Sequence, residues 1–339
     1  MMNYRNLIRS ICALAGAALI GSGASAQDTV TLKVASFSPP TGLFNSKVLV
    51  PFLDQVVADS EGTLEYKFFP SGALGRSPVE QLKLVTDGVA DMAFVIPSYT
   101  PGELDAYGVT EIPGVAENSS TASVALWRAY ADGLLPKPEG VVVVGLGTTF
   151  PQTLHSTKPI GSLNDLNGMR IRSASAAQTE AVKALGATPI SNLRAPEVAE
   201  GLSRGTVDAV AFDFAAGSAF RSHQVTPYYL TDVTFGAFAL MLPINEATWN
   251  ALPDPAKAAF EKHMGENFAR FNGETFDAAE MADRQTQEAE GKTFVNLDQA
   301  EIDKAADIFE EARVNWGAAS AEQQEVLDHV MNTLGTLQQ

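Results

Sequence analysis

The spacing of hydrophobic and polar residues along this chain of 339 residues predicts strands and helices in alternation. Runs of apolar or strictly alternating residues are typical of strands. We expect strands at residues 30–35, 63–69, 90–96, 141–146, 169–173, 207–212 and 237–244. Between several of these runs, apolar residues recur three and four positions apart, which is the helical period. Strands and helices in alternation predict an α/β fold with parallel strands.

Two parts of the pattern carry particular expectations. The run 141–146 is apolar throughout, so we expect a buried strand in the centre of a sheet. From Pro253 onward the helical period dominates, and four helices are predicted there. Their ranges are 255–271, 275–290, 299–316 and 321–337.

Residues 164–214 form a strand–helix–strand unit with chemistry at its strand ends. Arg172 lies at the end of the first strand, and Phe212 and Phe214 lie at the end of the next. Ligands of such units bind beyond the carboxyl ends of the strands. Because a guanidinium group matches a carboxylate, the unit predicts a site for a carboxylate attached to an apolar body.

The residues alone leave other roles open. An arginine on a short strand is commonly a surface or salt-bridge residue, and a phenylalanine commonly packs in a core. We expect Phe212 and Phe214 to share one face, so that both line the crevice or both pack. We expect Arg170 to point to the face opposite Arg172, so that only one of the two arginines enters the crevice.

A short repeat indicates two similarly built halves. Gly-Val-Ala-Asp at 88–91 and Gly-Thr-Val-Asp at 205–208 both follow a predicted helix and precede an apolar strand. Two such helix–turn–strand units are typical of two α/β lobes. Within them, we interpret Asp91 and Asp208 as turn or cap residues rather than ligands.

The first 26 residues have the pattern of a signal peptide. Arg5 and Arg9 precede an apolar stretch at 11–20, and small residues end at Ala26, after which we expect cleavage and a mature protein in the periplasm. The only cysteine, Cys12, lies in this segment. A chain of this length buries enough apolar surface without disulfides, and its length predicts about two domains.

The charge balance narrows the classes of partner. The net charge of −17 becomes −19 when the signal peptide is removed, because that segment holds two arginines and no acidic residue. Nucleic acids and anionic membranes bind clustered Lys and Arg, so neither is an expected partner. An anionic ligand must therefore be held by a local arginine.

Catalytic and cofactor motifs are scarce. The four histidines lie far apart and have no cysteine to complete a zinc set: His155, His223, His263 and His329. The mature sequence has no Gly-x-x-x-x-Gly-Lys-Ser/Thr phosphate-binding loop, since Gly291-Lys292-Thr293 has Thr286 where the first glycine is needed, and it has no Gly-x-Ser-x-Gly elbow. Nothing singles out a catalytic pair of carboxylates. We therefore expect a binding protein with no cofactor; the sequence marks no metal ligands, and its acidic surplus neither requires nor excludes a bound cation.

Several segments resemble the solute-binding proteins of tripartite ATP-independent periplasmic (TRAP) transporters. The longest is Ile-Gly-Ser-Leu-Asn-Asp-Leu-Asn-Gly-Met-Arg-Ile-Arg at 160–172. Others, in the order expected for the family, are Phe-Pro-Ser-Gly-Ala-Leu-Gly at 69–75, Gly-Val-Ala-Asp-Met-Ala at 88–93, Ala-Leu-Gly-Ala-Thr-Pro at 184–189, Gly-Thr-Val-Asp at 205–208 and Trp-Asn-Ala-Leu-Pro at 249–253. Together they span nearly the whole mature chain.

The resemblance implies a two-lobe periplasmic binding protein fold with hinge-crossing strands and a long C-terminal helix. It places residues 27–149 and 238–277 in lobe 1, and residues 150–237 and 278–339 in lobe 2. It also implies closure around a small organic acid, which is then passed to the small and large membrane subunits of a TRAP transporter. A receptor of the ATP-driven type and a secreted α/β enzyme acting on a small carboxylate remain as alternatives.

The resemblance also assigns residues to the site. Arg172 falls on the family arginine that pairs with the ligand carboxylate. Gln152 stands where many members have a second arginine. Ala211-Phe212, followed by Asp213-Phe214, stands where sialic- and dicarboxylic-acid binders have a Glu-Asn pair. These departures favour a monocarboxylate with an apolar or aromatic part. Loop residues of the first lobe are expected to close over it: Ser36, Phe37, Ser98 and Tyr99.

Overall fold

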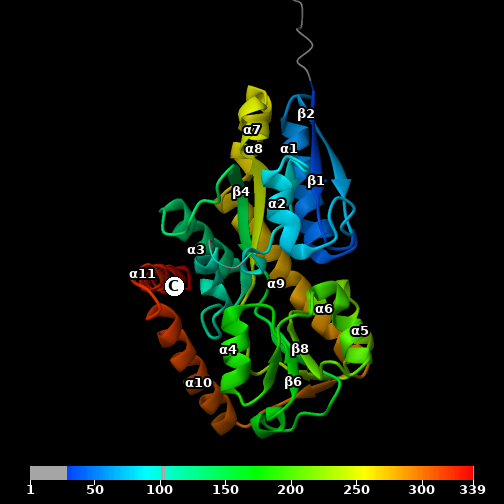
Figure 1. The fold of residues 1–339 in the computed structure, drawn as a ribbon, viewed down its shortest axis with the longest axis vertical. Coiled ribbons are helices and arrows are strands. Elements are labelled where there is room, and N and C mark those ends of the chain that lie inside the picture. Colours follow the sequence, from blue (N-terminus) through cyan, green and yellow to red (C-terminus); the bar gives the residue numbers. More distant parts are fainter. Residues whose placement is uncertain (1–28, 101, 103, 339) are drawn as a thin grey trace, which may run out of the picture.

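The computed structural model describes residues 29–100, 102 and 104–338. They form two lobes, each built on a mixed β-sheet with helices packed on it (Figure 1). The predicted signal peptide lies outside the described residues. The sheet of lobe 1 has the order β2 (Leu64–Phe69), β1 (Val30–Ala35), β3 (Met92–Ala93), β10 (Ala239–Asn245) and β4 (Val141–Thr148). The sheet of lobe 2 has the order β11 (Thr293–Val295), β9 (Tyr228–Leu230), β5 (Thr153–Ser156), β8 (Ala209–Phe212), β6 (Arg170–Arg172) and β7 (Thr188–Ile190).

The expected parallel pairing holds for only part of each sheet. β1 runs parallel to β2 and β3, and β6 runs parallel to β7 and β8. Antiparallel pairs form where β10 and β5 enter each sheet from the other lobe. β4 forms the edge of its sheet rather than the centre, and most of its residues are buried because α3 and α9 pack against it.

The short repeat at residues 88–91 and 205–208 forms the same backbone bridge between neighbouring strands in both lobes. Asp91 accepts a hydrogen bond from the N–H of Lys33 in β1 (2.7 Å) and donates its own N–H to the Lys33 carbonyl (2.8 Å). Asp208 makes the equivalent pair of bonds with Arg170 in β6, at 3.0 and 2.7 Å. Both aspartates are therefore turn residues that join adjacent strands, as predicted.

Two segments cross between the lobes side by side. Residues 149–152 join β4 to β5, and residues 235–238 join β9 to β10. They are paired by backbone hydrogen bonds from Gln152 to Gly236, from Phe235 to Gln152 and from Thr149 to Phe238. Gly236 has a φ of 76°, and a Cβ there would lie 2.2 Å from the Glu111 backbone, so only glycine fits. These paired segments confirm the predicted hinge-crossing strands.

Helices cover both sheets. In lobe 1 they are η1 (Phe44–Leu49), α1 (Val50–Asp59), η2 (Pro78–Glu80), α2 (Gln81–Thr86), η3 (Pro97–Tyr99), η4 (Asp105–Glu111), α3 (Ser119–Ala131), α7 (Glu246–Ala251) and α8 (Asp254–His263). In lobe 2 they are η5 (Leu163–Leu166), α4 (Ala176–Ala184), η6 (Ala195–Glu197), α5 (Val198–Ser203), α6 (Phe214–Ala219) and η7 (Ser222–Gln224). Three more complete the chain: α9 (Glu266–Ala289), α10 (Gln299–Gly317) and α11 (Ala321–Leu337). No helix among the described residues is long and apolar enough to cross a membrane.

The long helix α9 runs along both lobes (Figure 1). We expected a break at Asn272-Gly273, since both residues disfavour helix interiors, but the helix is continuous and the break comes at Gly265. A Cβ on Gly273 would lie 2.4 Å from the α3 backbone, and the Asn272 amide donates to the Thr148 carbonyl (2.9 Å). Close packing on lobe 1 therefore outweighs the local preference.

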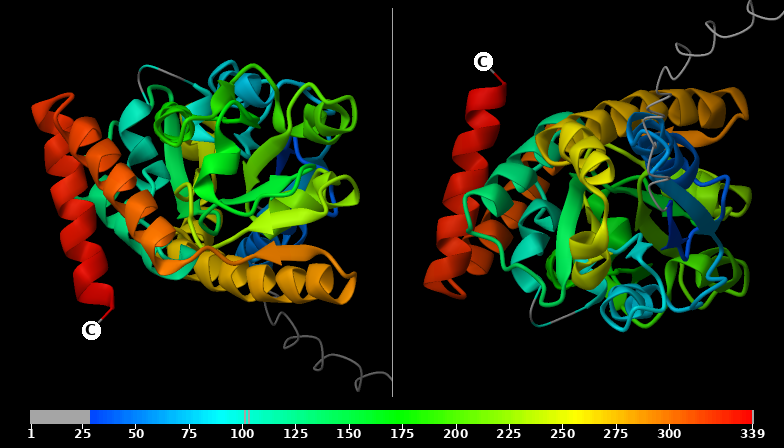
Figure 2. Two further views of the ribbon diagram at one scale, coloured as in Figure 1. Left: turned by 90° about the horizontal axis from the view of Figure 1, so that it is seen from below. Right: turned by 90° about the horizontal axis from the view of Figure 1, so that it is seen from above.

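The last two helices lie along one side of the molecule (Figure 2). α10 packs on α4 of lobe 2, whereas α11 packs on α3 of lobe 1. Val326, Val330 and Leu334 of α11 share a buried cluster with Ala125 and Leu126 of α3. The chain thus returns to lobe 1 at its end, although we expected residues 278–339 to belong to lobe 2. An apolar helix face packs where a matching face is available, and the sequence order does not specify which lobe offers it.

Candidate functional site

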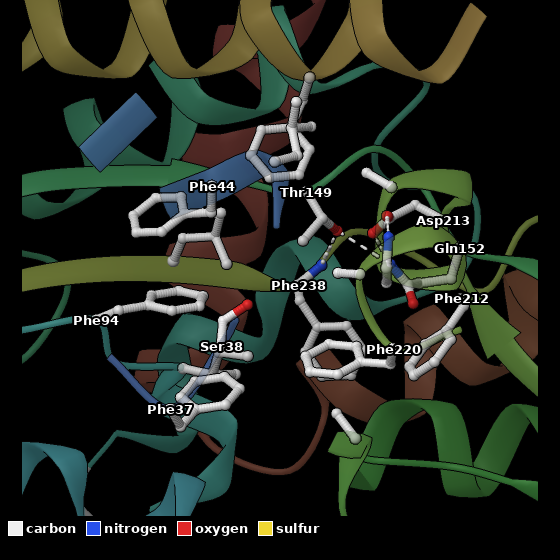
Figure 3. A pocket seen from close by; sticks show the side chains of 18 of the residues that line it. Phe37, Ser38, Phe44, Phe94, Thr149, Gln152, Phe212, Asp213, Phe220 and Phe238 are labelled. Carbon is white, nitrogen blue, oxygen red and sulfur yellow. Dashed lines mark hydrogen bonds between the residues drawn. The ribbon is translucent and has the colours of Figure 1, made fainter. Parts of the chain in front are cut away.

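A cavity of about 70 Å³ lies between the lobes, beside the crossing segments (Figure 3). Its walls are almost entirely apolar, and aromatic rings from both lobes make up much of them: Phe37, Phe44, Phe94, Tyr99, Phe212, Phe220, Phe238 and Phe276. In lobe 1, Phe94 stacks between Phe37 and Phe44, with centroid distances of 4.9 and 4.1 Å. A larger cavity, about 510 Å³, lies between α4 and α10, but no cationic side chain lines it.

Arg172 brings a positive charge to the cavity from the last position of β6. Its side chain is 1% exposed. Nε donates to the Leu193 carbonyl (3.2 Å), Nη2 donates to the hydroxyl of Tyr99 in lobe 1 (3.3 Å), and Cζ lies 5.1 Å from the centre of the Phe212 ring. Nη1 is buried and has no hydrogen-bond partner among the described residues.

The burial of Arg172 costs free energy when no ligand is bound. A buried guanidinium without a carboxylate partner is costly, because neutral acceptors replace only part of its hydration. The cost is offset when a ligand carboxylate enters and pairs with the unused donors. Arg172 is therefore arranged to receive an anion at the edge of an aromatic cavity.

Arg170 has a different environment. Its Nε and Nη2 donate to the two carboxylate oxygens of Asp208 at 3.1 and 2.8 Å, and Lys158 adds a salt bridge to the same carboxylate (2.9 Å). Arg170 and Lys158 lower the pKa of Asp208, although burial acts in the opposite direction. Arg170 stays out of the cavity, but our expectation of opposite faces was wrong. Residues two apart share a face of a strand, and Ile171 is the residue that points the other way, into the lobe 2 core.

A polar corner built from Gln152, Asp213 and Thr149 lies in the same cavity (Figure 3). Gln152 Nε2 donates to Asp213 Oδ2 (2.7 Å) and to Thr149 Oγ1 (3.1 Å). Asp213 is also the N-cap of α6, where Oδ1 accepts from the N–H of Ala216 (2.6 Å). Burial raises the pKa of Asp213 to about 6, although the hydrogen bonds from Ala216 and Gln152 act in the opposite direction.

A second carboxyl group lies behind this corner. Glu280 of α9 is 6% exposed and accepts a hydrogen bond from the N–H of Phe214 (2.9 Å). Burial first, and the charge of Asp213 second, raise the pKa of Glu280 well above its usual value. The two buried carboxyl groups thus disfavour each other's ionisation, and a further anionic group on a ligand would be disfavoured at this end of the cavity for the same reason.

Phe212 and Phe214 take different positions, although we expected them to share a face. Phe212 lines the cavity, whereas Phe214 packs inside lobe 2 against Tyr229, His155 and His223, with ring centroids 5.0 to 5.5 Å apart. β8 ends at Phe212, and α6 begins at Phe214. Strand alternation stops at that boundary, so the prediction that both rings point the same way was wrong.

The residues predicted in the loops of lobe 1 also separate. Phe37 and Tyr99 line the cavity, but Ser36 does not, because its Oγ accepts from the N–H of Ser38 (3.2 Å) and Ser38 takes the lining position. Ser98 lies away from the cavity, beside the buried carboxyl group of Glu111.

Glu111 was not predicted as a residue of interest. Its side chain is 1% exposed, and neither carboxylate oxygen has a hydrogen-bond partner in good geometry within the described structure. Burial raises the pKa of Glu111 to about 7, offset in part by the nearby hydroxyls of Ser98 in lobe 1 and Ser175 at the start of α4 in lobe 2. No sequence pattern marks this carboxyl group, because its burial depends on both lobes.

The sequence also did not single out several rings of the cavity. Phe44 lies in η1, Phe94 follows β3, Phe238 lies in a crossing segment, and Phe276 lies in α9. Each is part of an apolar run that is equally typical of a core. Within the described residues, no group of three or more His, Cys, Asp or Glu side chains is placed to hold a metal ion.

The family model of bacterial extracellular solute-binding proteins, family 7, matches residues 38–316. The chain belongs to this family of TRAP solute-binding proteins. It is thus a receptor for a small organic acid of the kind that serves a TRAP transporter. Family members are periplasmic receptors that work with membrane permease components.

Individual relatives are more distant. The chain is 26% identical over 304 residues to a protein named outer membrane transporter protein TsaT from Comamonas testosteroni, covering 86% of each. It is 24% identical to a TRAP solute-binding protein from Rhodoferax ferrireducens crystallised with copurified benzoate, with a TM-score of 0.86 over 91% of this chain and 98% of the other. A TRAP protein from a marine metagenome, crystallised with 3-hydroxybenzoate, has 24% identity and a TM-score of 0.85 over 91% and 99%. These structures confirm the two-lobe fold.

Proposed function

We propose that this solute-binding protein is a periplasmic receptor for a small aromatic monocarboxylate, which it delivers to the small and large membrane subunits of a TRAP transporter. The observation that carries the proposal is the buried guanidinium of Arg172, whose Nη1 has no partner in the described structure and whose Cζ lies over the ring of Phe212. A carboxylate fits these donors, and an apolar ring fits the aromatic walls. The benzoate and 3-hydroxybenzoate bound to structural relatives support the same ligand class.

Closure explains how one ligand is retained between two lobes. Tyr99 from lobe 1 reaches Arg172 in lobe 2, so the guanidinium is enclosed when the lobes meet. Enclosure excludes water and strengthens the ion pair. A ligand that pairs with Arg172 therefore stabilises the closed state over the open one, and this difference in affinity drives closure.

The alternatives have less support. Membership of the TRAP family disfavours a receptor of the ATP-driven type. It also favours a receptor over a secreted enzyme, and conversion of a bound acid to product by the purified protein would revive the enzyme hypothesis. We propose export with cleavage after Ala26, which the signal-peptide pattern of residues 1–26 supports, and mass spectrometry of the protein from a native periplasm would locate its first residue.

The test is a thermal-shift and calorimetric screen of the mature protein after removal of any copurified ligand by unfolding and refolding. Benzoate, phenylacetate and mandelate represent aromatic monocarboxylates, while succinate and glucuronate represent dicarboxylates and sugar acids. A ligand at a hundred times its dissociation constant adds about 2.7 kcal/mol of stability. We expect that stabilisation from the aromatic acids alone. Stabilisation by succinate or glucuronate but by no aromatic acid would contradict the proposal.

A further inference from the structure

Gln152 is held at the edge of the cavity by the hinge itself. Its backbone N–H donates to the Gly236 carbonyl (2.8 Å), and its carbonyl accepts from the N–H of Phe235 (2.8 Å). The side chain is 1% exposed and lines the cavity beside Asp213 and Thr149 (Figure 3). A buried side chain on a backbone paired in this way has a fixed direction, so the orientation of its amide group affects what the cavity can bind.

The neighbours of the amide nitrogen determine that orientation. Nε2 lies 2.7 Å from Asp213 Oδ2, 3.1 Å from Thr149 Oγ1 and 3.4 Å from the carbonyl oxygen of Phe150. A carbonyl and an ionised carboxylate have no proton to donate, and the Thr149 hydroxyl already donates its proton to the Phe150 carbonyl (2.8 Å). All three neighbours are acceptors, so the donating end of the amide must face them.

The other end of the amide is consequently an acceptor. Gln152 Oε1 accepts no hydrogen bond from any described residue, and it is not among the buried oxygens that those residues close off from solvent. Its donors are committed to Asp213, Thr149 and Phe150, so Gln152 has no N–H group left to donate to a ligand carboxylate. A carboxylate near Oε1 would be repelled, whereas a hydroxyl or N–H group would be bound.

We propose that the natural ligand carries a hydrogen-bond donor, a hydroxyl or an N–H group, in addition to its carboxylate, and that Gln152 Oε1 accepts that donor. This inference rests on the proposed function and narrows it from aromatic monocarboxylates to those with a donor group. Gln152 is then the residue that determines specificity, and Asp213 is a positioning residue that holds the amide in its orientation.

Calorimetry with matched ligands tests the inference. The ligands are benzoate, its three hydroxy isomers and the three formylbenzoates, which offer an acceptor in place of the donor. We expect at least one hydroxy isomer to bind about tenfold more tightly than benzoate and its formyl counterpart, a ratio that corresponds to about 1.4 kcal/mol and lies within the range of one hydrogen bond. Equal affinities for benzoate and all three hydroxy isomers would overturn the inference while leaving the proposed function intact. If no aromatic acid binds, both fail together.

Asp213→Asn tests the orientation directly. The introduced amide can still cap α6 through its oxygen, but its NH₂ group then donates toward Gln152, so the Gln152 amide turns over and presents its own NH₂ to the cavity. We expect the hydroxyl-to-benzoate affinity ratio to fall from about ten to one or below, and the formyl-to-benzoate ratio to rise. Ratios are used because removing a negative charge strengthens the binding of every anion.

Gln152→Met is the second variant, and it removes the acceptor at similar length. The hydroxyl-to-benzoate ratio is expected to fall to about one there too, so the test stands even where Asp213→Asn does not fold. Circular dichroism and thermal unfolding establish which variants are folded. A tenfold preference for the hydroxy isomer that persists in a folded Gln152→Met protein would overturn the assignment of Gln152.

Discussion

Each lobe contains an equivalent pair of parallel strands joined by an aspartate, but the residues that follow this bridge differ in character between the lobes. In lobe 1, Asp91 bridges to Lys33 and β1 continues to Ala35; in lobe 2, Asp208 bridges to Arg170 and β6 continues to Arg172. The register is equivalent, because Ala35 pairs with the second residue after Asp91 just as Arg172 pairs with the second residue after Asp208.

The lobes differ in the residues that come after each bridge. Ala35 belongs to a buried apolar cluster, and the loop after it supplies Phe37 to the cavity wall. Arg172 buries a charge that no carboxylate of the described structure neutralises. One backbone arrangement thus leads to an apolar wall in lobe 1 and to a buried cation in lobe 2, the cation that we propose pairs with the carboxylate of the ligand.

Arg172→Ala should have the largest effect on this division of roles. We expect a loss of about 2–5 kcal/mol in binding, the range for truncating one partner of a buried charge pair. Arg170→Ala is the matched control on the same strand, and it should lower the stability of the fold while leaving affinity nearly unchanged, because its partner is Asp208. Calorimetry on both variants measures the contrast. Normal affinity in Arg172→Ala would refute the carboxylate assignment.

Glu111→Gln tests whether the carboxyl group buried between the lobes makes the stability of the fold depend on pH. Burial raises the pKa of Glu111 from an ordinary value near 4.5 to about 7. The folded state therefore favours the protonated acid: stability from this group is fully present below pH 4.5 and is lost as pH rises through 7. The loss corresponds to about 3 kcal/mol. Asp213 acts in the same direction, from 3.8 to about 6.

Urea unfolding at pH 5 and pH 8 measures this effect. A neutral amide has no charge to bury, so Glu111→Gln should gain stability over the parent protein at pH 8 and much less at pH 5. An equal difference between the two proteins at both pH values would show that the carboxyl group does not titrate in this range.

Asp208→Asn and Asp91→Asn compare the bridges themselves. Asp208 is almost fully buried and holds Arg170 and Lys158 as well as a backbone N–H, so losing its charge should cost about 2–4 kcal/mol of stability. Asp91 meets only the N–H of Lys33 and the Thr248 hydroxyl in the described structure, and its variant should cost about 1 kcal/mol. Chemical denaturation at neutral pH compares them, and equal costs would mean that the charge pairs contribute nothing.

The smallest effect is expected at the two phenylalanines. Phe212→Leu removes the ring below the guanidinium of Arg172 and should weaken ligand binding by about 1 kcal/mol. Phe214→Leu should leave affinity unchanged and lower the melting temperature, because that ring packs inside lobe 2. Affinity and thermal unfolding of both variants separate the two roles, and a matching loss of affinity in Phe214→Leu would contradict the geometry.

The sequence by itself determined the α/β fold and the family. Strand and helix periods are local properties, and so are the turn residues around Asp91 and Asp208, so each segment could be interpreted without its neighbours. The place of Arg172 at the end of a strand was also visible, because strand ends in such units meet the crevice between the lobes. The assignment of Arg172 to a ligand carboxylate stays a prediction.

The tertiary structure decided which surfaces meet. α9 continues through Gly273 because α3 approaches it closely, and Glu111 is buried because residues from both lobes surround it. Phe212 and Phe214 separate at a strand–helix boundary, and the Gln152 amide is oriented by Asp213, 61 positions along the chain. Local pattern specifies whether a face is apolar or polar, whereas the partner of that face is selected by contacts between residues distant in sequence.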